Sequence, residues 1–121
     1  MKLTTAMINA LAEALNDARI ARNAGDFEGA WDTLIHAHII SQPALLPHLA
    51  VHTRMLGLAF AQSDMREIVG QMLRLALAPL GHFLGRTPWG NPGRANVSKF
   101  ARVPLPKDVA VLYAEAGVEV K

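Results

Sequence analysis

The sequence predicts an all-α fold of four main helices, arranged as two stacked helical hairpins, with an extended C-terminal segment packed across them. Three observations support this prediction. Apolar residues recur every three or four positions up to about residue 84, as helices with one buried face require. Capping residues and helix breakers divide that region into four pieces. Beyond residue 84 the chain becomes rich in Gly, Pro and Asn and loses the helical period.

The first predicted hairpin ends near Ser41. The apolar residues that mark the buried face of its first helix are Ile8, Leu11, Leu15 and Ala18. Gly25 stops this helix, and Asp26 is a suitable N-cap for the second helix, which runs to about Ser41.

The second predicted hairpin follows the segment QPALLP, which breaks the helical pattern. Its first helix begins at Pro43 or Pro47, since proline is tolerated in a first turn, and runs to about Gln62. The next helix starts with the capping-box spacing of Asp64-Met65-Arg66-Glu67. We expect Pro79 to kink that helix, because proline removes one backbone hydrogen bond.

An internal repeat supports the paired arrangement. Residues 24–37 align with residues 62–75, which places Ala30 on Ile68 and Leu34 on Met72. The first copy, with Gly25-Asp26-Phe27, resembles the second half of a tetratricopeptide repeat, so we expect tetratricopeptide-like hairpins. Two repeats are fewer than a solenoid needs, so the four helices should close on themselves.

The chain is expected to form a single domain over residues 1–121, with a four-helix core at 1–84. The Gly/Pro-rich segment 85–107 is basic, without an acidic residue, and a short helix is predicted at 108–117. This segment is too apolar for a disordered linker, so Trp89 and Phe100 are predicted to anchor it to the helices.

Composition excludes several classes of protein. The 121 residues contain no cysteine, which rules out disulfides, thiolate catalysis and zinc sites built on sulfur, and favours the cytoplasm. A net charge of +2 gives no nucleic-acid signature, and no apolar run is long enough to span a membrane. No nucleophile motif is present, so the sequence favours a non-enzymatic protein; an enzyme with a histidine general base is the alternative.

Four of the five histidines fall within residues 36–55. His48 and His52 lie one helical turn apart, the spacing by which one helix offers two imidazoles to a metal. His38 continues the inward stripe of the preceding helix, so an antiparallel hairpin brings it towards His48. Three imidazoles with water or a carboxylate suit Zn²⁺, Ni²⁺, Co²⁺ or Cu²⁺, and His82 is an additional candidate ligand. The alternative is that these histidines are hydrogen-bonded polar residues of the core.

The element GNPGRANVS offers a second candidate site. Backbone and side-chain donors around it could contact an anion or a protein partner, and the residues concerned are Arg86, Arg94, Asn96 and Lys99. The alternative is that its glycines and prolines shape a covering loop.

Four stretches carry a resemblance to a known family. They are AHIISQ (37–42), HLAVHTRML (48–56), REIVGQMLRL (66–75) and APLGHFLGRTPWGNPGRANVS (78–98). Together they make the chain resemble a bacterial family catalogued as domain of unknown function 3703. The resemblance implies no established activity, although family members look like companions of heavy-metal efflux genes. We therefore expect a small metal-binding accessory protein, or alternatively an interaction module or homodimeric scaffold that uses a hairpin groove and the C-terminal segment.

Overall fold

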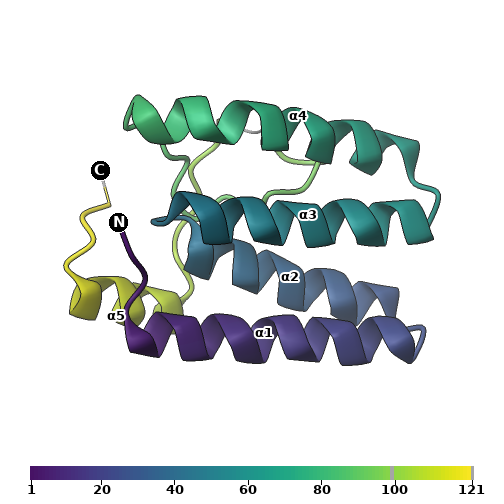
Figure 1. Ribbon diagram of the computed structural model, residues 1–121, viewed down its shortest axis with the longest axis horizontal. Coiled ribbons are helices and arrows are strands. Elements are labelled where there is room, and N and C mark those ends of the chain that lie inside the picture. The colour runs from purple at the N-terminus through teal and green to yellow at the C-terminus, as the bar shows by residue number, and fades with distance from the viewer. Residues whose placement is uncertain (99, 121) are drawn as a thin grey trace.

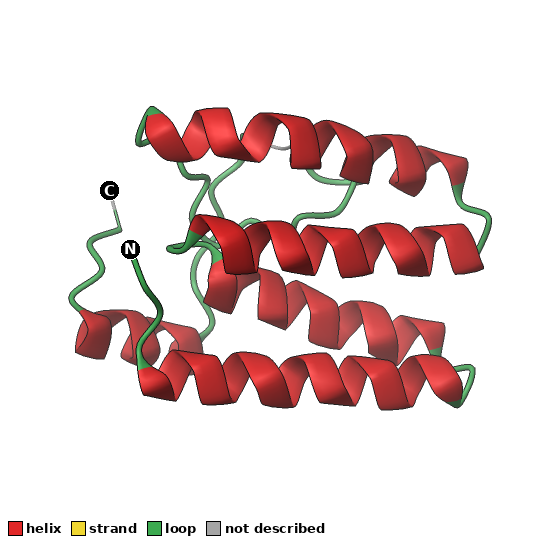
Figure 2. Ribbon diagram, viewed as in Figure 1, coloured by secondary structure: helices red, strands yellow, loops and turns green. Residues whose placement is uncertain are grey.

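The computed structural model describes residues 1–98 and 100–120, and within these residues it contains five helices and no strand. The helices are α1 (Thr5–Asn23), α2 (Phe27–Ser41), α3 (Leu45–Ala61), α4 (Met65–Phe83) and α5 (Lys107–Ala116). Figure 1 shows α1 to α4 side by side in chain order, with α5 at one end of the bundle. Figure 2 shows that the described residues form only helices and loops. The predicted all-α class is confirmed, and α1–α2 and α3–α4 each pack as a hairpin.

Side-chain caps begin three of the helices. Thr4 Oγ1 accepts from Met7 N at the start of α1, and Asp26 and Asp64 accept from the third residue of α2 and α4. These bonds satisfy backbone donors that have no partner inside the helix.

The start of α3 differs from the prediction. The helix begins at Leu45, between the two candidate prolines, and its first backbone bond runs from His48 N to Ala44 O. Pro47 therefore lies in the first turn, where its missing N–H costs nothing. At the other end of the hairpin, α4 continues through Pro79 and ends at Phe83.

Two apolar clusters hold the bundle together. The larger lies between α1, α2 and α3 with a contribution from α4, and its buried members are Ala14, Ala18, Ala30, Trp31, Leu34, Ala37, Val51, Met55, Leu58, Ala59 and Ile68. The smaller joins α5 to α1 and α2 through Met7, Ile39, Ile40, Val109 and Tyr113. The prediction that Ile8 lies on the buried face of α1 was wrong, since Ile8 is 52% exposed and its neighbour Met7 is buried.

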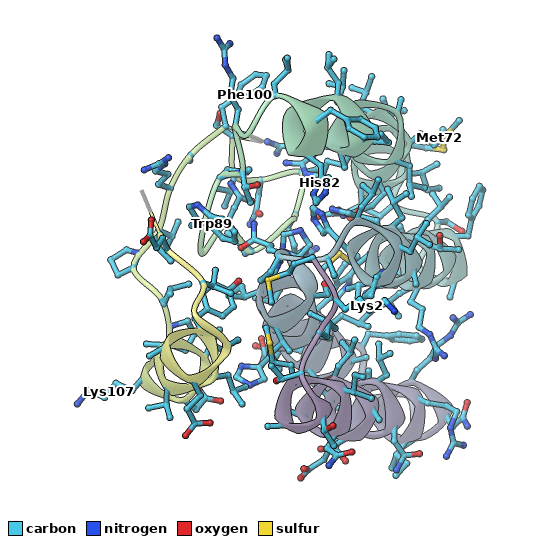
Figure 3. All side chains as sticks on the ribbon, turned by 60° about the vertical axis from the view of Figure 1, so that its left-hand side comes forward. Lys2, Met72, His82, Trp89, Phe100 and Lys107 are labelled. Atoms are coloured by element: carbon cyan, nitrogen blue, oxygen red, sulfur yellow. The ribbon has the colours of Figure 1, made fainter. Side chains whose placement is uncertain are left out.

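Helix α4 buries its polar face. Its buried side chains include Glu67, Gln71 and Arg74, whereas Met72 is 55% exposed and points away from the bundle in Figure 3. The alignment that equated Met72 with the buried Leu34 therefore fails here. The cause is the C-terminal segment, whose backbone lies against this face and supplies polar partners.

The segment between α4 and α5 is fixed by side-chain bonds to its backbone. Gln42 donates to Pro88 O and accepts from Gly90 N, which ties the segment to the end of α2. Asn91 donates to the carbonyls of Ser98 and Ala101 and so closes the loop between them.

The two aromatic residues of this segment have different environments. Trp89 packs edge-on against Tyr113, with ring centroids 5.7 Å apart, and contacts the smaller core cluster. Phe100 is 75% exposed and lines a cavity together with Leu77 and Ala78 of α4, so its role as an anchor stays a prediction. Across the described part of the chain, every helix is too short or too polar to cross a membrane.

Candidate metal centre

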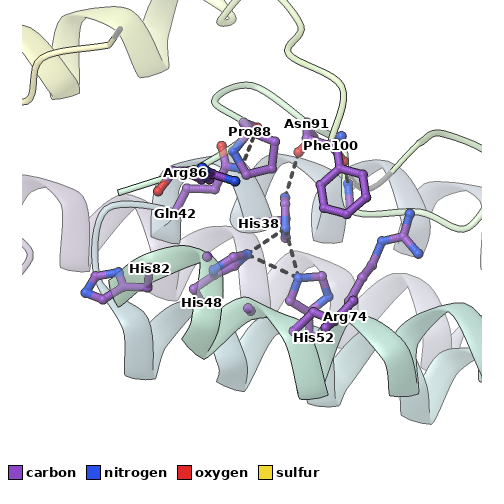
Figure 4. A pocket seen from close by; sticks show the side chains of 15 residues that line it. His38, Gln42, His48, His52, Arg74, His82, Arg86, Pro88, Asn91 and Phe100 are labelled. Atoms are coloured by element: carbon purple, nitrogen blue, oxygen red, sulfur yellow. Dashed lines mark hydrogen bonds between the residues drawn. The ribbon is translucent and has the colours of Figure 1, made fainter. Parts of the chain in front are cut away.

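Three buried histidines converge between α2 and α3. His38 comes from the last turn of α2, and His48 and His52 come from the first half of α3. Their Nε2 atoms lie 2.9 Å apart for His38 and His48, 3.1 Å for His38 and His52, and 3.1 Å for His48 and His52. Figure 4 shows the three rings pointing towards one another. We call these residues the histidine triad.

The local fold explains why the triad forms. A short turn after Ser41 reverses the chain, so that the end of α2 faces the start of α3. His48 and His52 are separated by four residues and therefore project from one face of α3, towards His38.

A backbone carbonyl fixes the tautomer of His38. Its Nδ1 lies 2.7 Å from Asn91 O, and a carbonyl oxygen only accepts, so Nδ1 carries the proton and donates. The Nε2 of a neutral His38 is consequently an unprotonated lone pair, directed at the other two rings.

Gln71 of α4 fixes His52 in the same way. Its Nε2 donates to Glu67 Oε2 (3.1 Å) and to Gly93 O (2.8 Å), so its other amide atom must be the oxygen. That oxygen lies 2.7 Å from His52 Nδ1, which therefore donates to it. The lone pair of His52 Nε2 is thus also directed into the triad.

The triad holds fewer protons than its contacts need. With both Nδ1 atoms donating, neutral His38 and His52 face each other with two lone pairs 3.1 Å apart. Only His48 can supply a proton at Nε2, and one proton cannot serve all three short contacts. The arrangement is therefore electron-rich at its centre.

All three imidazoles favour the neutral form. Burial lowers the pKa of His48 to about 3, with smaller contributions from the neighbouring His52 and His82. Burial lowers the pKa of His52 to about 4, although its bond to Gln71 acts in the opposite direction. Burial, followed by His48, lowers the pKa of His38 well below the ordinary value. At neutral pH the triad is in the protonation state that metal coordination requires.

A second layer of bonds holds these partners in place. Glu67 accepts from Arg94 Nε (2.8 Å) and from Ala95 N (3.0 Å). The Arg94 guanidinium also lies 3.9 Å above the Trp31 ring, a cation–π contact. Arg74 donates from Nη2 to two carbonyls of the C-terminal segment. These bonds hold Gln71 and the C-terminal segment in place, and so fix the orientation of the His38 and His52 imidazoles.

One side of the triad borders a cavity of about 80 Å³. This volume is several times what one water molecule needs, so the cavity can hold several waters or a small ligand. Its remaining lining residues are Gln42, Arg74, Leu77, Ala78, Gly81, His82, Arg86, Thr87, Pro88, Asn91, Gly93 and Phe100. An ion at the triad would thus have an accessible side.

The other candidate residues lie in different places. His82 lines the cavity, but the ligand atoms that lie within 4.8 Å of one another belong to His38, His48 and His52. Arg86 is exposed and lines the cavity as well, whereas Asn96 is exposed at a separate hollow beside α4.

The predicted anion-contact residues are thus not gathered at one point. The Arg94 guanidinium turns inward to Glu67, and Lys99 lies outside the described residues. The N–H groups of Gly90 and Gly93 donate to Gln42 and Asn91 inside the protein.

Sequence reasoning missed the residues that orient the triad. Gln71 lies in a helix and Asn91 in a Gly/Pro-rich loop, and nothing in the sequence around either residue marks it as a partner of a histidine. One signal was available, because Glu67, Gln71 and Arg74 share one helix face opposite the apolar residues of α4.

Comparison with known proteins places the chain in a family. A family model described as a protein of unknown function (DUF3703) matches residues 5–113, so the chain belongs to that family. Neither a curated protein nor a solved structure matches the chain.

Proposed function

We propose that this DUF3703 protein binds a divalent transition-metal ion, Zn²⁺, Ni²⁺, Co²⁺ or Cu²⁺, through Nε2 of His38, His48 and His52. The observation that carries the proposal is the convergence of three imidazole Nε2 atoms within 3.1 Å of one another. Two of them, in His38 and His52, are unprotonated because Nδ1 of the same ring is a donor. Metal-binding histidines usually donate their second nitrogen to a carbonyl or an amide in this manner. The protein acts as a metal-handling accessory in the cytoplasm rather than as an enzyme.

The separations suit coordination to one ion. An ion about 2.0–2.1 Å from each nitrogen holds the nitrogens about 2.9 Å apart at right-angled coordination and about 3.4 Å apart at tetrahedral coordination. The observed 2.9–3.1 Å matches three ligands on one face of a six-coordinate ion. Tetrahedral zinc requires the three separations to widen by about 0.3–0.5 Å, a small movement of three side chains.

The competing explanation is a polar core without a ligand. Buried histidines of that kind normally reach partners with complementary donors and acceptors. Here the Nε2 atoms of His38 and His52 face each other as acceptors, which favours a cation between them.

Calorimetric titration of metal-stripped protein with Zn²⁺, Ni²⁺, Co²⁺ and Cu²⁺ tests the proposal. We expect one equivalent to bind, and His48→Gln and His52→Gln to weaken binding by more than about 100-fold, since changing an outer partner alone costs 10–100-fold. His36→Gln is the matched control, because His36 is half-exposed and pairs with Asp108. Circular dichroism establishes that each variant is folded. A folded wild type that binds none of the four ions contradicts the proposal.

A second function rests on a separate observation, the apolar outer face of α4. Large exposed apolar residues follow one another along this helix, namely Met65, Val69, Met72, Leu73, Leu77, Leu80 and Phe83. Contiguous exposed apolar surface is typical of an interaction site. We propose that the hairpins are tetratricopeptide-like and that this face, rather than the predicted groove, pairs with a second copy of the chain.

Sedimentation velocity tests the homodimer. We expect the mass to double with concentration, and Met72→Glu to abolish this change, since it places a charge on the apolar face. Ile8→Glu, an equally exposed position on α1, is the control. A monomer at all concentrations contradicts self-association.

A further inference from the structure

A divalent ion at the triad would lack a compensating negative charge. Three neutral imidazoles leave the two positive charges of a divalent ion uncompensated. Of the carboxylates, Glu67 reaches this region through Gln71, but it already pairs with Arg94 at 2.8 Å. A buried charge is costly unless an opposite charge pairs with it.

The cavity beside the triad is lined by basic rather than acidic side chains. Among the described residues that line it, none is acidic, and its charged groups are Arg74 and Arg86. Arg74 is engaged with the carbonyls of Arg94 and Val97, but its positive charge remains beside the cavity. The protein therefore adds positive charge where the ion would need negative charge.

One of the two arginines that line the cavity is exposed to solvent. Arg86 is exposed and lies near Pro88 on the side of the triad occupied by His48 (Figure 4). The volume of about 80 Å³ accommodates a ligand of a few heavy atoms beyond the ion.

From these observations we infer that the cavity binds a small oxyanion, which coordinates the metal ion through an anionic oxygen while Arg86 pairs with it at the entrance. The ligand class is a short carboxylate or an inorganic oxyanion, since both offer such an oxygen of suitable size. This inference rests on the proposed metal site. It goes beyond that site by assigning the ion an exchangeable fourth ligand, supplied from solution rather than by the chain.

The test uses the full chain loaded with one equivalent of Co²⁺, whose visible absorption reports its coordination. Acetate and inorganic phosphate are added in separate titrations at constant ionic strength. We expect a saturable change in the Co²⁺ spectrum with at least one of them. Arg86→Gln should weaken that anion about threefold to tenfold, the effect of losing one partly solvated charged hydrogen bond. Arg54→Gln, an exposed position outside the cavity, is the control for charge removal and should leave the affinity unchanged.

The outcomes separate the two proposals. A response to acetate alone assigns an organic carboxylate, and a response to phosphate alone assigns an inorganic oxyanion; either supports the inference. A Co²⁺ spectrum that neither anion alters overturns the inference and leaves metal binding in place. Equal weakening by Arg86→Gln and Arg54→Gln overturns the assignment of the cavity entrance. The absence of protein-bound Co²⁺ absorption before any anion is added overturns the inference. The metal proposal fails with it only when calorimetry also finds no binding of Zn²⁺, Ni²⁺ or Cu²⁺.

Discussion

Gly93→Ala should weaken the fold and the histidine triad together. Gly93 has a φ of +82°, and a Cβ at this position would lie 2.8 Å from both Cδ2 and Nε2 of His38. The added methyl group therefore strains the backbone and also pushes on a proposed ligand atom.

The structure allows these two effects to be separated. A side chain in the left-handed region costs about 1–2 kcal/mol, and overpacking a buried site costs about 1–3 kcal/mol more. Gly25 has nearly the same φ, +78°, but nothing lies within 4 Å of the Cβ that alanine would add. Gly25→Ala therefore carries the backbone cost alone.

Urea unfolding of the metal-free variants measures the first effect, and calorimetric titration with Zn²⁺ measures the second. We expect Gly93→Ala to lose about 1–3 kcal/mol more unfolding free energy than Gly25→Ala. We also expect its metal affinity to fall by at least about tenfold, as for other changes next to a ligand. Equal losses of stability in the two variants, or an unchanged metal affinity in Gly93→Ala, would refute the packing of the segment against His38.

Three further predictions concern the surroundings of the triad. Lowering the pH from 6.5 to 5 should destabilise the metal-free protein by about 1.6 kcal/mol in total for each triad histidine. The reason is that histidines of the unfolded chain take up protons near pH 6.5, whereas folded His48 and His52 do so only near pH 3 and 4. In urea unfolding, the free energy of unfolding of His52→Gln should depend less steeply on pH than that of the wild type. A wild-type free energy of unfolding that stays unchanged down to pH 5 would contradict the burial of neutral imidazoles. Gln71→Leu should reduce Zn²⁺ affinity by about 10–100-fold because His52 loses its orienting acceptor, and an affinity equal to wild type in calorimetry would show that the bond is irrelevant. Arg94→Ala should lower the free energy of unfolding in urea by about 2–3 kcal/mol, since buried Glu67 loses its ion pair. Arg54→Ala, at an exposed position, should lower it by less than about 0.5 kcal/mol. Similar decreases in the two variants would argue against the buried pair.

Local sequence patterns were sufficient to predict the helices and part of the candidate metal site. The spacing of four residues placed His48 and His52 on one face, and the hairpin brought His38 towards them, as the short Nε2 separations now record. Caps at Asp26 and Asp64 also follow from the sequence alone, because a cap depends on residues only three positions away.

Contacts between distant parts of the chain were not predictable in this way. The repeat alignment put an apolar face of α4 inward, but the structure buries Gln71 and Arg74 there instead. Their partners are backbone carbonyls of the C-terminal segment, at Gly93, Arg94 and Val97. Helical periodicity reports which residues share a face, but it cannot show that a polar loop covers that face.

X-ray absorption spectroscopy of the protein loaded with one equivalent of Zn²⁺ is the most direct test of the central claim. We expect three imidazole nitrogens about 2.0–2.1 Å from the ion, and we expect His38→Gln to remove one of these three ligands. A spectrum with fewer than three imidazoles in wild type, or one that His38→Gln leaves unchanged, would contradict metal binding at the histidine triad.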